Sequence, residues 1–379
     1  MQVSPRIAII GGGPGGLTLA RILHVMGMEA AVFEADAGSD VRGQGGSLDL
    51  HTESGLMALE AAGLMEGFNR IARPEDQGVR LYDKDGRCVY NGDDEPHDGR
   101  PEIDRAHLRA LLLRSLPEGT VRWGSKIRAI EPLADGTYAV LSEQGVMQPF
   151  DLVIGADGTW SRTRGLVSRE MPGYTGVTFA EMTIEDADRC HPDLSRLVGK
   201  GKIFALAEGK GLIAQRNSGG KLHVYATLNL TDHRRTEISR DQVLAQYADW
   251  SPDLLALIHA AGDEMAARSI HVFPVGYRWD HRPGVTLLGD AAHVMSPFAG
   301  EGVNNAMLDA VELAKALGRL DWCAGVREYE EAMFARIPES AAQSAESMAA
   351  FLAPDGLEKA VHIFRQHTAG EMQPQGSQS

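Results

Sequence analysis

Residues 6–16 read RIAIIGGGPGG, an apolar run that stops at a cluster of glycines. A helix-like pattern follows from Leu17 to Met26, and a second apolar run, Ala30–Phe33, ends at the acid Glu34. This hydrophobic periodicity, interrupted by the glycine cluster, predicts a strand, a glycine turn, a helix and a second strand. The order is that of a βαβ unit, which predicts a parallel sheet with helices packed on its faces.

The glycine cluster fits the pattern GxGxxG at Gly11, Gly13 and Gly16. Gly11 permits a tight turn, Gly13 lets the backbone approach a pyrophosphate, and Gly16 allows close packing of helix on strand. The pyrophosphate would lie on the unpaired amides and the positive end of the helix, where Pro14 is also a predicted cofactor contact. At the end of the second strand, the Glu34 carboxylate can accept both hydroxyls of a ribose. Together these features predict a dinucleotide site.

A second motif, TLLGDAAHVMSPFAGEGVN, occupies residues 286–304. A predicted strand ends before a turn at Gly289 and Asp290, and a second predicted helix begins after the loop from Pro297 to Gly302. Asp290 can accept hydrogen bonds from a sugar-like chain. The amides from Gly300 to Val303 lie at a helix N-terminus, which suits a developing negative charge. Reduced flavin carries such a charge along its N1/C2 edge, so the motif favours FAD as the dinucleotide.

A third motif, ADGTWSRTR at residues 156–164, follows a buried strand predicted at Asp151–Ile154. It contains DGxxSxxR, beginning at Asp157; an Asp-Gly pair alone is typical of a turn. Residues 104–116 read as an amphipathic helix with Asp104 as its N-cap.

GGGPGG, ADGTWSRTR and GDAAHVMSPFAGEGVN, in this order and at these separations, resemble the motifs of para-hydroxybenzoate-hydroxylase-fold flavoprotein monooxygenases. The likeness covers nearly the whole chain. Three stretches are similar to those of the tetracycline destructases: RGQGGSLDLH (42–51), PEIDRAHLRALLLRSL (101–116) and MSPFAGEGVN (295–304). The resemblance implies FAD as cofactor, NADPH or NADH as a transient reductant, and O₂ as oxidant. It also implies oxygen transfer from a flavin C4a-hydroperoxide, with no protein group acting as base.

The resemblance assigns roles to single residues. Arg42 resembles the arginine beside the isoalloxazine ring, and Asp49 resembles a flavin-side carboxylate. Arg105 resembles the arginine that clamps the FAD phosphates or ribityl chain, Asp290 the carboxylate on the ribityl chain, and Asp157 is a further predicted cofactor contact. The alternative is that Arg42 and Asp49 form a surface ion pair and that Arg105 is an ordinary surface residue at a helix start.

Several residues are predicted to meet the substrate. His223, in KLHVYATL, falls where destructases have a substrate-contacting histidine, while apolar residues around Phe204 fill a neighbouring polar position. Phe298 is expected to face the substrate, and Met348 and Phe351 are candidate wall residues. The alternatives are a structural role for His223 and ordinary helix packing for the tail residues. The implied substrate is a planar aromatic or polyketide-type molecule, with tetracycline the first compound to try.

Short alternating runs between residues 173 and 267 predict an antiparallel sheet inserted into the dinucleotide-binding unit. We therefore predict an α/β protein with a Rossmann-type FAD-binding domain, an inserted substrate domain and a C-terminal helical segment, in which Pro338 is expected to break or kink the helix. The predicted boundaries are 1–172 and 268–322 for the FAD-binding domain, 173–267 for the substrate-binding domain, 323–367 for the helical segment and 368–379 for a disordered tail.

The net charge of −15 argues against binding nucleic acid or an anionic membrane surface through a general field. Cys88, Cys190 and Cys323 form no CxxC pair, so we expect reduced packing residues rather than dithiol or zinc chemistry. Neither a signal peptide nor a membrane-length apolar run is visible. These features predict a cytoplasmic, monomeric enzyme with a small-molecule substrate and no metal.

Other functions are compatible with this fold. A flavin-dependent halogenase usually shows a WxWxIP stretch, and none of the five tryptophans forms WxW. A flavin dehydrogenase or reductase would consume NAD(P)H without adding oxygen, and a flavin-holding sensor would bind FAD without turnover. A tailoring hydroxylase of aromatic polyketide biosynthesis is the alternative to antibiotic inactivation.

Overall fold

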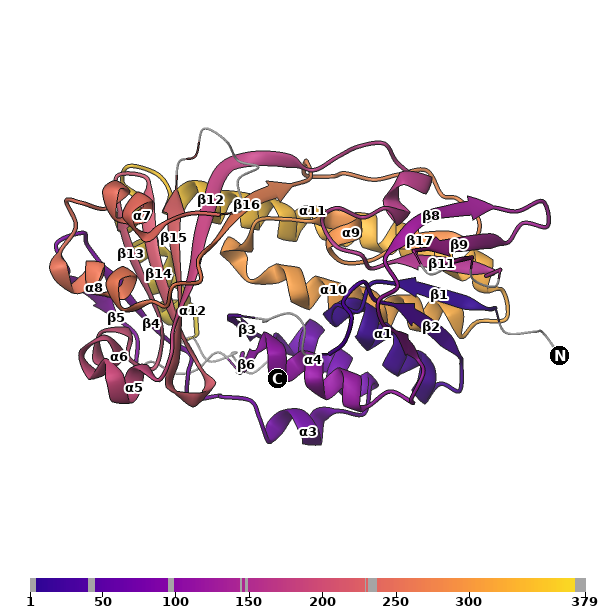
Figure 1. The fold of residues 1–379 in the computed structure, drawn as a ribbon, viewed down its shortest axis with the longest axis horizontal. Coiled ribbons are helices and arrows are strands. Elements are labelled where there is room, and N and C mark those ends of the chain that lie inside the picture. The colour runs from indigo at the N-terminus through magenta and orange to yellow at the C-terminus, as the bar shows by residue number, and fades with distance from the viewer. Residues whose placement is uncertain are drawn as a thin grey trace, which may run out of the picture.

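A computed structural model describes residues 5–39, 45–94, 99–143, 145–146, 149–228, 230 and 237–371. Two sheets lie at opposite ends of an elongated molecule, and helices α10 (Glu301–Leu317) and α11 (Trp322–Phe351) run between them (Figure 1). The arrangement confirms the predicted α/β class, with a dinucleotide-binding unit, a second sheet and a helical C-terminal part.

The first sheet has five strands in the order β17-β11-β1-β2-β7, and every neighbouring pair is parallel. Its strands are β1 (Ile7–Ile10), β2 (Ala30–Phe33), β7 (Val121–Arg122), β11 (Leu152–Gly155) and β17 (Val285–Leu287). Counted along the chain this is the order 3-2-1-4-5, which is the Rossmann arrangement. The predicted Rossmann-type unit is therefore confirmed.

Strand β1 is buried on both faces, which explains why its sequence is continuously apolar. Ile7 and Ile9 pack in the core that includes helix α1 (Pro14–Val25), whereas Ala8 and Ile10 face a small antiparallel sheet. That sheet consists of β8 (Ile127–Pro132), β9 (Tyr138–Ser142) and β10 (Gly145–Val146). Helix α1 begins at Pro14, earlier than predicted, because proline is compatible with the first turn of a helix.

The second sheet has seven strands in the order β16-β12-β15-β14-β13-β4-β5, and only β13 and β4 pair in parallel. Its strands are β4 (Gly78–Tyr82), β5 (Cys88–Asn91), β12 (Gly173–Ile184), β13 (Gly201–Ala207), β14 (Lys210–Asn217), β15 (Lys221–Leu228) and β16 (Ala266–Val272). Helices α5 (Ala187–Cys190), α6 (Pro192–Val198), α7 (Arg240–Gln246) and α8 (Pro252–Ala260) lie at its outer side (Figure 1). Strands β4 and β5 come from the N-terminal part of the chain, so residues 173–267 do not form this sheet alone.

The remaining elements join the two sheets. They are β3 (Ser47–Asp49), η1 (Thr52–Leu56), α2 (Met57–Ala61), α3 (Met65–Asn69), β6 (Glu102–Asp104), α4 (Arg105–Arg114), η2 (Thr163–Leu166), η3 (Ser218–Gly220), α9 (Asp290–His293), η4 (Pro297–Ala299) and α12 (Gly356–Glu371). Strands β3 and β6 pair antiparallel at the centre of the molecule.

The C-terminal helices differ in detail from the prediction. Helix α11 continues through Pro338, so the helix is not broken there. Buried Met333 and Ile337 anchor this part of α11 in the core, which offsets the roughly 3 kcal/mol that an interior proline costs. Helix α12 runs to Glu371, into the segment 368–379 expected to be disordered; residues 372–379 lie outside the described part of the chain.

Two side-chain predictions are corrected. The cysteines Cys88, Cys190 and Cys323 are free as expected but exposed, so they are not packing residues. Asp104 occupies the N-cap position of α4 but makes no side-chain cap. Its carboxylate instead accepts a hydrogen bond from Arg73, which lies 31 residues earlier in the chain.

No helix in the described ranges is long and apolar enough to cross a membrane. Within the same ranges, no group of three or more His, Cys, Asp or Glu side chains is arranged to hold a metal ion.

Candidate active site

A cavity of about 1490 Å³ lies between the two sheets, and it is lined by strands of the second sheet and by the segments that follow β1, β11 and β17 of the first. Its volume exceeds the ~300–1,000 Å³ usual for a small-molecule site, so it has room for a cofactor beside a second molecule. Most predicted cofactor residues line it: Gly13, Pro14, Gly16, Asp49, Arg105, Asp157, Asp290, Pro297, Gly300, Gly302 and Val303. Arg42 lies outside the described residues, and Gly11 and Glu34 lie behind the cavity wall.

The glycine turn shapes one wall of this cavity. Gly11 has a φ of +109°, and a Cβ there would lie 2.3 Å from the Ala156 carbonyl oxygen. A Cβ on Gly13 would meet no atom within 4 Å, so the backbone at the start of α1 faces open space. The Glu34 carboxylate accepts hydrogen bonds from the amides of Gly12 (2.7 Å) and Asp36 (2.9 Å). Glu34 therefore braces the turn, and its ribose contact stays a prediction.

The Gly289–Asp290 turn is held from behind by a buried carboxylate that the sequence analysis did not single out. Asp309 is fully buried and accepts hydrogen bonds from the Gly289 amide (2.8 Å), His293 Nε2 (2.7 Å) and Arg336 Nη2 (2.7 Å). Burial alone would raise the pKa of Asp309, but His293 and Arg336 outweigh it and keep the pKa below its usual value. The turn thereby presents Asp290 to the cavity.

The loop before α10 is tied to strand β3 by Asn304, whose side chain is buried. Its Nδ2 donates to the carbonyl oxygens of Asp49 (2.9 Å) and Gly300 (3.2 Å), and its Oδ1 accepts from the His51 amide (2.9 Å). Burial would raise the pKa of Asp49, yet Lys202 and His51 outweigh burial and hold the pKa well below its usual range. Asp49 is therefore a carboxylate anion beside the amides of the loop.

The DGxxSxxR motif is mainly a structural device. Asp157 accepts hydrogen bonds from Ser161 Oγ (2.5 Å) and the Arg162 amide (2.8 Å), which close the turn. Arg164 is buried and donates to the carbonyl oxygens of Thr159 (2.8 Å) and Ala291 (3.0 Å), so it joins this turn to helix α9. The motif therefore fixes the position of the turn at Asp157 relative to helix α9, and both border the cavity.

Helix α4 supplies two arginines one turn apart. Arg105 lines the cavity and makes no ion pair with another described residue. Arg109, which the sequence analysis did not single out, is buried and donates to the Ser39 carbonyl (2.8 Å). The sequence did contain a sign of this role: Arg109 follows Arg105 by four residues in the predicted helix, and residues at this spacing lie on the same helix face. Arg109 Nε also donates to the Gly12 carbonyl oxygen (3.4 Å) and so supports the glycine turn, whereas Arg105 lines the cavity and its contact with a cofactor phosphate stays a prediction.

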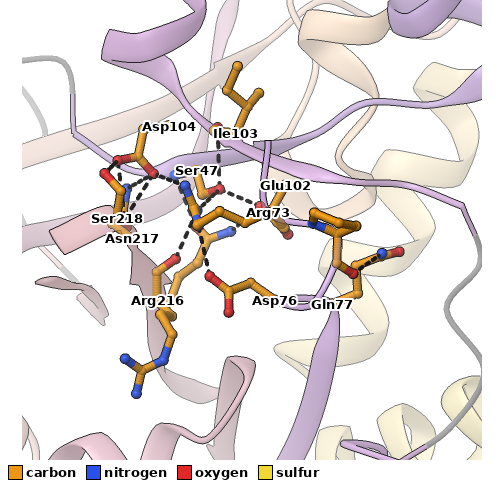
Figure 2. A network of polar contacts seen from close by, with 12 residues as sticks. Ser47, Arg73, Asp76, Gln77, Glu102, Ile103, Asp104, Arg216, Asn217 and Ser218 are labelled. Atoms are coloured by element: carbon orange, nitrogen blue, oxygen red, sulfur yellow. Dashed lines mark hydrogen bonds and ion pairs between the residues drawn. The ribbon is translucent and has the colours of Figure 1, made fainter. Parts of the chain in front are cut away.

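The base of the cavity is braced by a polar network around Arg73 (Figure 2). Arg73 donates to Asp104 Oδ1 (2.5 Å) and Ser47 Oγ (2.9 Å), and Ser47 donates in turn to Glu102 Oε2 (2.5 Å). Asp104 also accepts from Asn217 Nδ2 (3.1 Å), which belongs to the second sheet. The network links the β3–β6 pair to the second sheet.

These features fit FAD. An open helix N-terminus accommodates a pyrophosphate, Arg105 offers a cation to it, and Asp290 offers a carboxylate to a hydroxylated chain. The amides at Gly300–Val303 lie at the start of α10, where a helix favours negative charge. Bound there, FAD would supply the redox and oxygen chemistry, and the protein would supply binding, orientation and a closed cavity.

Aromatic side chains form the other end of the cavity. Phe204, Phe298 and Phe351 all line it, as the sequence analysis predicted for candidate substrate contacts, but Met348 does not. The ring centroids of Phe204 and Phe351 are 5.5 Å apart, and those of Phe298 and Phe351 are 6.1 Å apart. This end therefore presents a continuous aromatic wall.

His223 is not brought to the cavity wall. It is buried against Gly45, where an added Cβ would lie 2.4 Å from His223 Cε1, and its Nδ1 contacts Thr183 Oγ1 at 3.1 Å. Burial, with smaller contributions from Arg268 and Arg105, lowers the pKa of His223 to about 4. A neutral, buried imidazole suits a supporting role beside Gly45, and contact of His223 with the substrate stays a prediction.

This pKa predicts a pH-dependent stability. Between about pH 6.5 and about pH 4 the unfolded chain binds a proton at His223 that the folded chain does not, so wild type should lose up to about 3 kcal/mol on acidification. His223→Gln should lack this component, and exposed His24→Gln should keep it. Urea unfolding of the three proteins at several pH values in this window measures the difference; identical slopes would contradict the prediction.

The fold and the site define a class of flavoprotein, and comparisons with known proteins agree. Residues 5–321 match the family model described as FAD binding domain, and the chain belongs to this family of FAD-dependent monooxygenases. It is 33% identical over 367 residues to monooxygenase penA of Penicillium thymicola, covering 82% of this chain and 84% of that protein. It is 31% identical to 3-amino-4-hydroxybenzoate 2-monooxygenase PtnB3 of Streptomyces platensis, covering 93% and 90%.

The fold also resembles a solved destructase. The crystal structure of tetracycline destructase Tet(55) matches with a TM-score of 0.75 at 20% identity, covering 96% of this chain and 95% of that one. At this identity the likeness concerns the fold. The matched FAD-binding family model and the monooxygenase relatives establish FAD as the cofactor and oxidoreductase as the class, and they confirm the resemblance to the flavoprotein monooxygenases.

Proposed function

We propose that the protein hydroxylates a flat aromatic or polyketide-type small molecule, with NADPH or NADH as reductant. One oxygen atom of O₂ enters the substrate and the other leaves as water, and NAD(P)H supplies the two electrons. The first sheet holds FAD, and the second sheet with α11 and α12 holds the substrate. The observation that carries this proposal is one continuous cavity with a nucleotide-type wall at one end and an aromatic wall at the other.

The chain's own residues have separable tasks in this reaction. Gly13 and the start of α1 receive the pyrophosphate, and Arg105 and Asp290 hold the phosphate and the hydroxylated chain. The amides at Gly300–Val303, at the start of α10, would hold the flavin ring end of FAD and would favour negative charge there. Phe298 belongs to the aromatic wall and directly precedes the Ala299–Gly300 segment, so it would exclude water from the reacting centre.

The test is oxidation of NADPH, and separately of NADH, by the FAD-loaded enzyme with a panel of aromatic compounds, including 3-amino-4-hydroxybenzoate and tetracycline. We expect at least one compound to stimulate oxidation and to gain one oxygen atom in mass. Stimulation by tetracycline would favour antibiotic inactivation. Stimulation by other aromatic compounds alone would favour a tailoring hydroxylase.

Two outcomes would contradict the proposal. Reductant consumption with an unchanged substrate mass would indicate a flavin dehydrogenase or reductase. Tight FAD binding without any turnover of either reductant would indicate a flavin-holding sensor.

A further inference from the structure

A buried histidine lies between two carboxylates just after strand β3. His51 is only 2% exposed and occupies the N-cap position of η1. Its Nε2 lies 3.4 Å from Asp49 Oδ2, and its Nδ1 lies 3.7 Å from Glu301 Oε1. Because Asp49 ends β3 and Glu301 begins α10, the imidazole joins two segments that are far apart in the chain.

Both carboxylates border the region expected to hold the ring end of FAD. An added Cβ on Gly300 would lie 3.1 Å from Asp49 Oδ1, so this carboxylate packs against the loop before α10. The glycines on either side of Glu301 line the cavity, whereas Glu301 itself is not among the described residues that line it. Its side chain instead faces His51 and Asn305, whose Nδ2 donates to Glu301 Oε2 (3.3 Å).

The arrangement favours a shared proton. An imidazole between two carboxylates meets an acceptor on each side, so either both ring nitrogens or one carboxyl group must carry a proton. Burial raises the pKa of Glu301, and His51 opposes this rise, so Glu301 is the carboxyl suited to hold the proton when the ring does not. Asp49 stays an anion in both cases. The three groups therefore carry one negative charge rather than two. A further carboxylate, Glu53, lies 3.9 Å from Nδ1 but is 76% exposed, so solvent screens it.

This charge bears on the redox chemistry of FAD. A hydride from NAD(P)H brings two electrons and one proton to the ring system, which gains one negative charge. An uncompensated carboxylate a few ångströms away opposes that gain, and its effect is larger where water is excluded. The amides at the start of α10 favour the same gain. A group that removes one carboxylate charge beside these amides therefore raises the reduction potential of bound FAD.

We propose that His51 is a positioning residue that holds the Glu301 side chain, shares one proton with it, and thereby raises the reduction potential of bound FAD. This inference rests on the proposed function, in which the ring end of FAD lies at Gly300–Val303. His51 acts through Glu301 and from behind the loop, since His51 is not among the described residues that line the cavity.

The test is the midpoint potential of FAD in the loaded protein, measured by dye-coupled reduction in the absence of substrate. His51→Leu removes the proton that the ring shares while keeping a buried side chain of similar size. We expect its potential to lie at least about 30 mV below that of wild type, which is a tenfold change in the ratio of reduced to oxidised flavin for a two-electron couple. An unchanged or higher potential would overturn the inference.

A second pair of variants separates proton sharing from a general structural effect. With Glu301→Gln no carboxylate remains there to be neutralised, so adding His51→Leu should change the ratio of reduced to oxidised flavin less than about twofold. An equal fall in both backgrounds would indicate a structural role and contradict the inference. Glu301→Gln alone should keep or raise the wild-type potential; this variant also tests the inference if His51→Leu does not fold, because a lower potential would overturn it.

His281→Leu is the matched control. His281 Nδ1 lies 2.6 Å from Oε2 of the buried Glu330, but neither residue is among the described residues that line the cavity. This variant should lower the melting temperature and leave the potential unchanged, whereas a fall equal to that of His51→Leu would count against the inference. Failure of the proposed function would appear elsewhere, as the absence of any substrate-stimulated NAD(P)H oxidation or oxygenated product in wild type.

Discussion

Gly13→Ala is expected to weaken FAD binding by at least about tenfold while the FAD-free protein folds as wild type does. Gly13 has an ordinary φ of −80°, and an added Cβ meets no protein atom within 4 Å. The methyl group would instead project into the space at the start of α1 where the pyrophosphate is expected. A clash there acts on the ligand alone, and alanine at an N-cap costs the helix no more than about 1 kcal/mol.

Gly11→Ala is the informative partner of this variant. Its φ of +109° is unfavourable for alanine, and the Cβ would overlap the Ala156 carbonyl oxygen at 2.3 Å. We expect both the melting temperature of the FAD-free protein and the FAD content to fall. Flavin fluorescence and differential scanning fluorimetry on the two variants measure both effects. Wild-type FAD affinity in Gly13→Ala would exclude the proposed position of the pyrophosphate.

Asp309→Ala is expected to destabilise the protein by about 3–5 kcal/mol, the usual cost of removing one partner of a buried charge cluster. The substitution leaves the buried His293 and the Gly289 amide without their acceptor and removes one carboxylate from Arg336. Since the Gly289–Asp290 turn then loses its support, FAD affinity should fall as well. The melting temperature and the FAD dissociation constant measure the two consequences.

The pKa of Asp309 sets the conditions for this experiment. Because the pKa in the folded protein lies below its ordinary value of 3.8, wild type keeps the stabilisation until the pH falls below about 4. Asp309 is therefore an anion at about pH 7, and the difference between wild type and Asp309→Ala measured there reports the loss of that anion. Asp355→Ala, which removes an exposed partner of Lys359, is the control and should change little. An equally small effect of Asp309→Ala would show that the cluster is not needed for stability.

Local sequence patterns were sufficient to predict the order of strands and helices in the dinucleotide-binding unit. The glycine spacing, the apolar runs and the acid at Glu34 concern residues that are neighbours in sequence or separated by one helix. The positive φ at Gly11 requires glycine, and the continuously apolar sequence of β1 reflects its burial on both faces, so both properties follow from residue type. The predicted order of elements was therefore correct even where the start of α1 was placed too late.

Side-chain partners from distant segments could not be predicted in the same way. Asp104 was expected to cap its own helix, but the fold brings Arg73 to its carboxylate. His223 was expected to meet the substrate, but Gly45 packs against its ring and it is not among the described residues that line the cavity, so the contact stays a prediction. Asp309 and Arg336 lie in two helices whose packing alone makes them a pair.

The sequence by itself determined the βαβ unit, the glycine turn that begins its helix, and the presence of a second sheet. These properties follow from backbone sterics and from apolar periodicity, which act over a few residues. Only the tertiary structure decided that β4 and β5 join the second sheet, and that this sheet lines one side of the cavity. Strand pairing and cavity shape depend on contacts between segments far apart in the chain, and no local pattern specifies them.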